Sequence, residues 1–385
     1  MHRALVLWVG LVLVASLAQA GPLTPELKAK LEKAGPEEKV SCLVYMKQAY
    51  PFEALAGQPV KERIHTFQRI AKESQAPVLD YLRSRSREAE VKQTFWVMNG
   101  FHLLATPSVI QNLTERQDIS WINHDGEVHL VEPSYSPAPP SVLATEWNIS
   151  KIKADSCWAA GFTGQGIVIG ETDTGVDYTH PALQGKWSGY WHDAINDSTH
   201  PYDDHNHGTH CMGTIMGGDG PGPFADDIGV AFNARFAAAK VLNSGGSGTD
   251  AQCVEGLQFI ADLKESVDVK AVSNSWAGSR SDTFCYPVCR TLRAVGILPV
   301  FANGNSGPAP RTVQAPGDFA VTVGVGATTA ADTMAGFSSR GPAPDSVPWN
   351  NPSDWYRPDW NLIKPNLSAP GANIRSCIPG GLYAS

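Results

Sequence analysis

The stretch Ile167-Val-Ile-Gly-Glu-Thr-Asp173-Thr-Gly175 decides the fold, because a short apolar run ends directly in an acidic residue and a glycine. Runs of this length, bounded by turn residues, are typical of strands buried on both faces. We predict further strands at 236–242, 271–275, 297–302 and 320–325, and helices at 207–217, 249–267 and 283–295. This alternation predicts an α/β fold with a doubly wound, mostly parallel sheet that carries helices on both faces.

Polar residues directly after these strands are the candidates for a functional site, because ligands of open α/β sheets bind at the carboxyl ends of the strands. Asp173 follows the first strand, and His207 opens a helix in the segment His207-Gly-Thr-His210. The segments Asn274-Ser-Trp-Ala-Gly278 and Asn303-Gly-Asn-Ser-Gly307 follow two later strands. Each segment alone is a weak signal, and their order along the chain is specific.

In this order the motifs resemble those of the subtilisin-like serine protease family, from about residue 150 to the end. The resemblance implies an Asp-His-Ser triad, in which His207 is the general base that a weakly nucleophilic serine needs. Asp173 would orient and stabilise the imidazole, and the Asn305 amide would donate to the oxyanion. By the same resemblance, Ser275, Trp276 and Ala277 would pair with the substrate backbone, and Ala302, Asn303 and Gly304 would form a wall of the specificity pocket.

The nucleophile is the largest departure from the family pattern. The family's serine stands in a Gly-Thr-Ser-Met-Ala stretch that follows the segment matched by Ser368-Ala-Pro-Gly371, and the 385 residues contain no Gly-Thr-Ser. One explanation is a serine endopeptidase whose catalytic domain, 150–385, is incomplete and inactive as given. The other is a non-catalytic secreted binding protein on a subtilisin-like scaffold. We favour the first, because a binding protein has no need of Asp173, His207 and Asn305 together.

The N-terminal part is expected to direct and control the rest. Residues 1–20 have a short basic start, an apolar run and Ala18-Gln-Ala20, which predicts a signal peptide, secretion and no membrane attachment after its cleavage. Residues 21–132 predict a small α+β, ferredoxin-like unit that resembles the family's inhibitory propeptide. Residues 133–149 are rich in proline, which predicts an exposed linker and a processing region, with cleavage between about 130 and 150.

Composition narrows the partners. The net charge is −8 and no long basic run is present, which argues against nucleic acid. Protein or peptide substrates and the protein's own propeptide are therefore the expected partners. We assign no metal ligand, because the catalytic set explains His207 better than a metal cluster built from 203–210 would. Relatives often bind structural calcium, but no calcium loop is identified here. Cys285 and Cys289 are candidates for closing a small loop.

Overall fold

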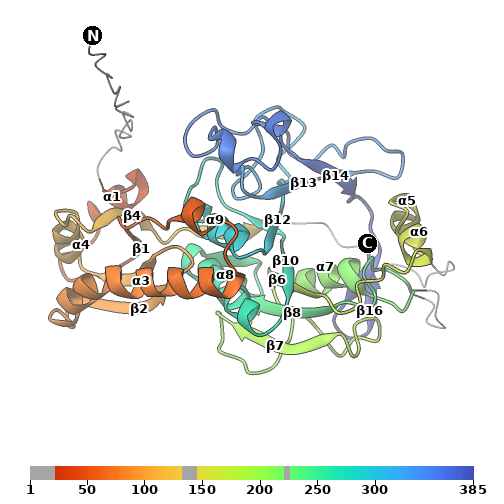
Figure 1. The fold of residues 1–385 in the computed structure, drawn as a ribbon, viewed down its shortest axis with the longest axis horizontal. Coiled ribbons are helices and arrows are strands. Elements are labelled where there is room, and N and C mark those ends of the chain that lie inside the picture. The colour runs from red at the N-terminus through yellow and green to blue at the C-terminus, as the bar shows by residue number, and fades with distance from the viewer. Residues whose placement is uncertain (1–21, 132–144, 221–225) are drawn as a thin grey trace, which may run out of the picture.

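The computed structural model describes residues 22–131, 145–220 and 226–385. The predicted signal peptide and most of the predicted linker lie outside these ranges and stay predictions. The described residues form an N-terminal unit, 22–131, and a larger unit that begins at residue 145 (Figure 1).

The larger unit is built on a seven-stranded parallel sheet of the order β14-β13-β12-β10-β6-β8-β7, which confirms the predicted fold class. Its strands are β6 (Val168–Asp173), β7 (Trp187–Asp193), β8 (Arg235–Lys240), β10 (Val269–Asn274), β12 (Leu298–Ala302), β13 (Val323–Thr328) and β14 (Leu367–Pro370). The two strands that the sequence did not predict, β7 and β14, are the edges of the sheet. They are mostly half-buried or exposed, so they lack the continuous apolar run of the central strands.

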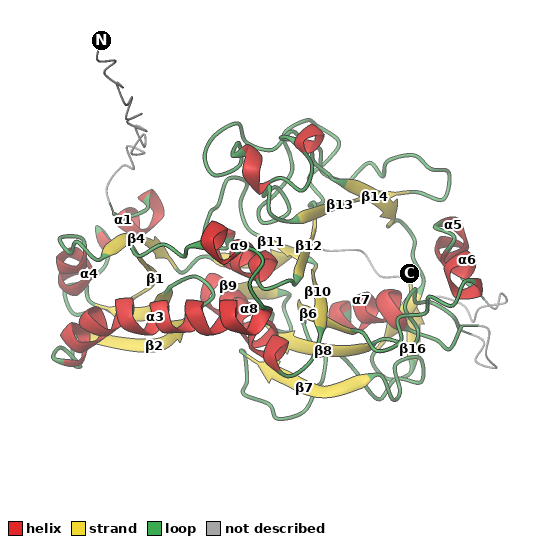
Figure 2. Ribbon diagram, viewed as in Figure 1, coloured by secondary structure: helices red, strands yellow, loops and turns green. Residues whose placement is uncertain are grey.

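Helices cover both faces of this sheet (Figure 2). A Cβ on Gly170 would lie 2.9 Å from Ile260, so this face of β6 packs against α8 (Asp250–Asp262). Side chains alternate along a strand, so Glu171 and Asp173 face the opposite side, which α7 (His207–Met216) covers. α9 (Tyr286–Ala294) packs beside α8. The remaining short elements are α5 (Trp147–Lys151), α6 (Ala154–Ala159), β15 (Ser376–Ile378), β16 (Leu382–Ala384), η1 (Leu263–Glu265), η2 (Pro352–Asp354) and η3 (Pro358–Trp360).

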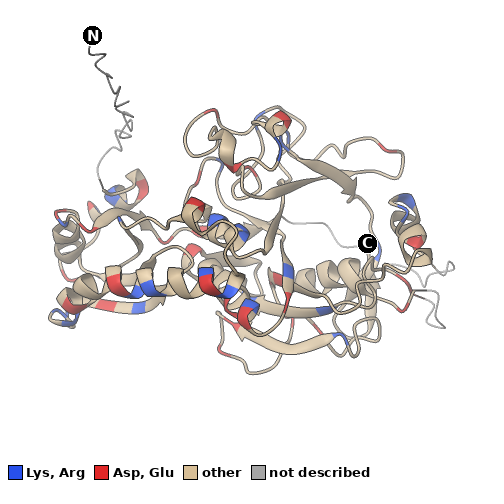
Figure 3. Cartoon of the chain, viewed as in Figure 1, with Lys and Arg blue, Asp and Glu red and all other residues tan. Residues whose placement is uncertain are grey.

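The N-terminal unit is an antiparallel sheet of the order β2-β3-β1-β4 with helices packed against it. Its elements are α1 (Pro25–Leu31), β1 (Val40–Met46), α2 (Phe52–Leu55), α3 (Val60–Arg83), β2 (Ala89–Phe95), β3 (Gly100–Ala105), α4 (Pro107–Leu113) and β4 (Ile119–His124). Acidic and basic residues lie side by side along α3, whereas α7 carries none (Figure 3).

The sequence predicted 93–105 as one extended segment, and this is wrong in detail. The segment turns between β2 and β3, where Asn99 has a φ of 49° and Gly100 leaves no room for a side chain. A Cβ on Gly100 would lie 2.1 Å from the Val44 carbonyl oxygen, so the hairpin depends on glycine there.

The last predicted strand of the N-terminal unit joins the larger unit instead of its own sheet. β5 (Glu127–Leu130) lies between β9 (Ser247–Thr249) and β11 (Trp276–Ala277), and it is antiparallel to both. Nearby, the Tyr45 hydroxyl donates to the Phe284 carbonyl, with 2.9 Å between the oxygens. One hydrophobic cluster also spans both units. The two units are therefore joined by strand pairing and by a shared core.

Among the described residues, no helix combines the length and the apolar character that a membrane crossing needs.

Candidate active site

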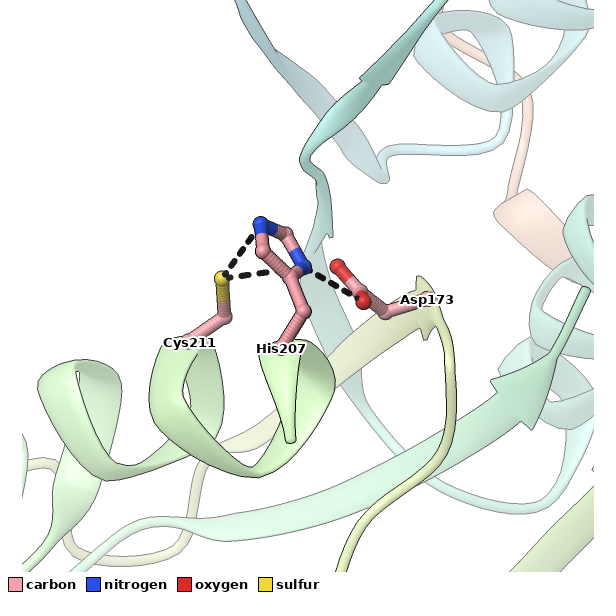
Figure 4. Close-up of side chains that lie close together, drawn as sticks. All are labelled: Asp173, His207 and Cys211. Carbon is pink, nitrogen blue, oxygen red and sulfur yellow. Dashed lines mark hydrogen bonds and ion pairs between the residues drawn. The ribbon is translucent and has the colours of Figure 1, made fainter. Parts of the chain in front are cut away.

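Asp173 and His207 meet at the carboxyl edge of the sheet. Asp173 is the last residue of β6, and His207 is the first residue of α7. The Asp173 Oδ1 and His207 Nδ1 atoms are 2.7 Å apart, and the two side chains are 1% and 4% exposed (Figure 4). Because a carboxylate accepts, Nδ1 carries the hydrogen of this bond, which leaves Nε2 of the neutral ring able to accept a proton.

Glycine and a capping aspartate hold the two segments together. A Cβ on Gly208 would lie 2.1 Å from the Gly175 carbonyl oxygen, so α7 can approach the end of β6 this closely only with glycine at 208. Asp203 Oδ2 accepts from the Thr209 backbone N–H in the first turn of α7. Its Oδ1 accepts from the Thr174 hydroxyl, directly after Asp173. The Asp-His geometry is therefore built into the backbone packing.

Burial and charge act on the His207 ring in opposite directions. Burial alone lowers the pKa of the imidazole, but the charge of Asp173, the neighbouring Cys211 and the hydrogen bond to Asp173 outweigh it. The pKa of His207 is therefore raised well above its usual value, so the pair favours the imidazolium that a proton-accepting base becomes.

Glu171 is a second carboxyl group on the same face of β6. Its side chain is 1% exposed, and among the described residues neither of its oxygens has a hydrogen-bond partner. Burial, and then the charge of Asp173, raise the pKa of Glu171 well above 4.5. At neutral pH this side chain is therefore a neutral acid beneath the Asp-His pair.

Sequence reasoning missed Cys211, which it interpreted as a small buried thiol. Cys211 lies one helical turn after His207, and its Sγ is 3.8 Å from Nδ1 and 3.9 Å from Nε2 of the ring. Its thiol donates to the Ser275 hydroxyl at 3.5 Å. The i to i+4 spacing on a predicted helix was the signal that could have found it. The donor atoms of Asp173, His207 and Cys211 lie within 4.8 Å of one another, a set that suits a soft divalent ion such as Zn²⁺.

The predicted backbone-binding segment contacts the N-terminal unit. Trp276 of β11 lies opposite Leu130, and Ala277 lies opposite His129. The Ser275 carbonyl accepts from the Val131 N–H, with 3.2 Å between the atoms.

The predicted pocket wall and the predicted oxyanion donor lie across from this strand. The Asn305 amide nitrogen donates to the Val131 carbonyl at 3.3 Å. Ala302, Asn303 and Gly304 line a cavity of about 640 Å³ together with His207 and Asn305. The Asn303 amide donates inward to the Ser339 carbonyl at 2.8 Å. Its polar group is therefore used inside the protein.

The residues of the alternative metal cluster at 203–210 have other partners. Asp203 caps α7, and Asp204 pairs with the buried Lys240 at 2.6 Å. His210 lies 3.0 Å from the Ile374 carbonyl, to which its Nε2 donates. Burial, followed by the charge of His207, lowers the pKa of His210 to about 4. His210 therefore stays neutral and stabilises the packing of α7.

The seven cysteines are free thiols. Cys285 and Cys289 lie one helical turn apart with 3.8 Å between their sulfur atoms, so they do not close the small loop that the sequence suggested.

A doubly wound sheet with a buried Asp-His pair and an amide donor at its carboxyl edge defines a site for nucleophile-and-base chemistry on a backbone carbonyl. The family model described as Peptidase_S8, Subtilase family, matches residues 164–384. The chain belongs to the subtilase family.

Curated relatives agree with this assignment. The chain is 32% identical over 348 residues to Bacillopeptidase F of Bacillus subtilis, an alignment that covers 81% of this chain and 23% of the relative. It is 31% identical over 309 residues to the serine protease AprX of the same species, with 76% and 63% covered. It is 27% identical over 299 residues to Subtilisin E, with 77% and 68% covered. The chain thus spans less than two thirds of the length of the first two relatives.

Proposed function

We propose that the whole protein is a secreted serine endopeptidase, made as a zymogen, that hydrolyses peptide bonds of proteins or peptides. Asp173, His207 and Asn305 would act with a serine hydroxyl supplied from outside the 385 residues. The observation that carries this proposal is the hydrogen-bonded Asp-His pair lining the same cavity as an asparagine amide that already donates to a backbone carbonyl.

Each residue has a role that follows from its position. His207 Nε2 takes the proton of the serine hydroxyl and returns it to the leaving amine. Asp173 holds the ring in the required tautomer and stabilises the imidazolium, which the raised pKa of His207 supports. Asn305 donates to the carbonyl oxygen as it becomes negative. The cavity of about 640 Å³ beside His207 gives the serine-bearing segment a place to enter.

The N-terminal unit is the proposed propeptide, and its mode of inhibition is steric. β5 fills the space between β9 and β11 with main-chain hydrogen bonds, the way an extended substrate adds to a sheet edge. A substrate cannot pair with β11 while β5 is there. The predicted signal peptide (1–20) would export the protein, and the predicted linker (133–149) would be cut or removed during maturation.

The alternative is a non-catalytic secreted binding protein on the same scaffold. The absence of Gly-Thr-Ser from the 385 residues favours it. The buried Asp-His pair argues against it, because burying a charged carboxylate beside a histidine is costly and a binding surface has no use for it.

A serine-reactive fluorophosphonate probe distinguishes the two. Protein expressed from the complete gene should be labelled once the N-terminal unit is released, and the His207→Ala variant should lose the label. His200→Ala is the matched control, because His200 is exposed. The 385-residue chain should stay unlabelled. A complete protein that takes no label would support the binding protein, and a labelled 385-residue chain would show that the nucleophile is within it.

A further inference from the structure

The position of Val131 in the site identifies one peptide bond. We propose that maturation hydrolyses the bond between Val131 and Glu132, and that the cleft selects aliphatic residues at the three positions held here by Val128, Leu130 and Val131. This inference rests on the proposed endopeptidase function and names its first substrate sequence, Val128-His-Leu-Val131.

The hydrogen bonds around Val131 fix the register. Its N–H donates to the Ser275 carbonyl at 3.2 Å, and its carbonyl accepts from the Asn305 amide at 3.3 Å. One residue earlier, the Leu130 N–H donates to the Gly246 carbonyl at 2.9 Å. The strand is thus held on both sides, and only the Val131 carbonyl lies at the proposed oxyanion donor. A shift by one residue would break all three hydrogen bonds and turn every side chain to the other face.

The side chains of β5 show what the cleft accepts. Val128 is fully buried and Leu130 is 7% exposed, and both belong to the hydrophobic cluster that contains Leu242 and Trp276. Glu127 and His129 point outward and are exposed. Val131 lines the cavity beside Ala302, Asn303 and Gly304. Aliphatic side chains are therefore favoured at positions 128, 130 and 131, whereas position 129 tolerates most residues.

The reaction consumes one water molecule. The serine oxygen attacks the Val131 carbonyl carbon, and the C–N bond to Glu132 breaks as His207 gives its proton to the leaving nitrogen. Water then hydrolyses the ester and restores the serine. The products are a carboxylate on Val131 and an ammonium group on Glu132.

The first test reads the released fragment. The complete protein is sampled early in maturation, and the N-terminal fragment is identified by mass spectrometry. We expect its last residue to be Val131. Val131→Pro should abolish this fragment, because proline has no N–H for the Ser275 carbonyl. Val142→Pro, in the predicted linker, should leave the fragment unchanged. A wild-type fragment that ends elsewhere overturns the proposed bond. A protein that labels with the fluorophosphonate probe but never cuts itself also overturns it, whereas failure of both labelling and cutting overturns the endopeptidase function.

The second test reads the preference with peptides. Mature protein is given Val-His-Leu-Val aminocoumarin amide, and kcat/KM is measured by fluorescence. Aspartate in place of the first valine or of leucine should lower kcat/KM roughly tenfold to a hundredfold, the loss expected when a buried aliphatic contact disappears. Alanine in place of histidine should change it less than about threefold. Equal cleavage of all four peptides would overturn the preference while leaving the endopeptidase function intact.

Discussion

The buried carboxyl of Glu171 makes the stability of this chain depend on pH, and the substitution Glu171→Gln removes that dependence. In the folded protein the pKa of Glu171 is raised well above 4.5, first by burial and then by the charge of Asp173. In the unfolded chain the same group titrates near 4.5. Above that pH the folded state holds a proton that the unfolded state has lost, so stability falls as pH rises until the folded pKa is reached.

The size of the effect follows from one proton. Each pH unit between the two pKa values costs a little over 1 kcal/mol of unfolding free energy, so the loss from pH 5 to pH 7 is roughly 2–3 kcal/mol. Glutamine has a similar shape and stays neutral in both states. The unfolding free energy of Glu171→Gln, relative to the parent, should therefore rise by about that amount between pH 5 and pH 7.

Urea unfolding of the 385-residue chain, followed by circular dichroism at pH 5, 6 and 7, measures this difference. The compared transition is the one in which the seven-stranded sheet unfolds. Glu37→Gln is the matched control, because Glu37 is exposed, and it should show no such rise. A Glu171→Gln difference that stays constant over the three pH values, or that shrinks, would refute the assignment of a neutral acid at this position.

Four further substitutions or modifications test the site and the interface. Asp173→Asn in the complete protein should lower kcat roughly 10⁴-fold and move the acid limb of the kcat/KM profile to lower pH, because the charge that raises the pKa of His207 is gone. Asn305→Ala should lower kcat roughly 10²–10³-fold with little change in KM, measured on the same peptide amide. Tyr45→Phe should lower the unfolding free energy of the 385-residue chain by about 1–3 kcal/mol, read from urea midpoints, because a buried carbonyl loses its donor. Iodoacetamide should inactivate the mature enzyme by placing a carboxamidomethyl group beside the imidazole, and Cys211→Ala should keep its activity under the same treatment.

The central part of the fold could be predicted because its signals are local. The buried strand before Asp173 and the helix that starts at His207 each carry a continuous pattern of their own, and β6 and α7 lie within a residue of the predicted bounds at either end. The edge strands β7 and β14 were missed because a strand with one neighbour needs no continuous apolar run. The turn at Asn99 was missed because a left-handed residue there is dictated by the close approach of β1, which lies far away in the sequence.

The site was only partly predictable for the same reason. Family order suggested Asp173, His207 and Asn305, and the structure brings all three to one cavity. Nothing local in 127–131 shows that this strand leaves its own sheet, since its partners at 247–249 and 275–277 lie more than a hundred residues away. Glu171 was read only as part of a strand, because a carboxyl whose neighbours come from another element gives no pattern.

The pairing of β5 also bears on what happens after the proposed cut. Hydrolysis would leave a carboxylate on Val131 within reach of the Asn305 amide and in the same cavity as His207, whose pKa is raised. A carboxylate accepts a stronger hydrogen bond than a peptide carbonyl, and it is attracted to an imidazolium. None of the backbone hydrogen bonds from Glu127 to Val131 depends on the bond that is cut. The cleaved N-terminal unit should therefore bind at least as well as the uncleaved one, so cutting alone would not free the cleft. Activation would then be governed by dissociation of this unit, through the strand ladder and the shared core, and not by the chemistry at Val131.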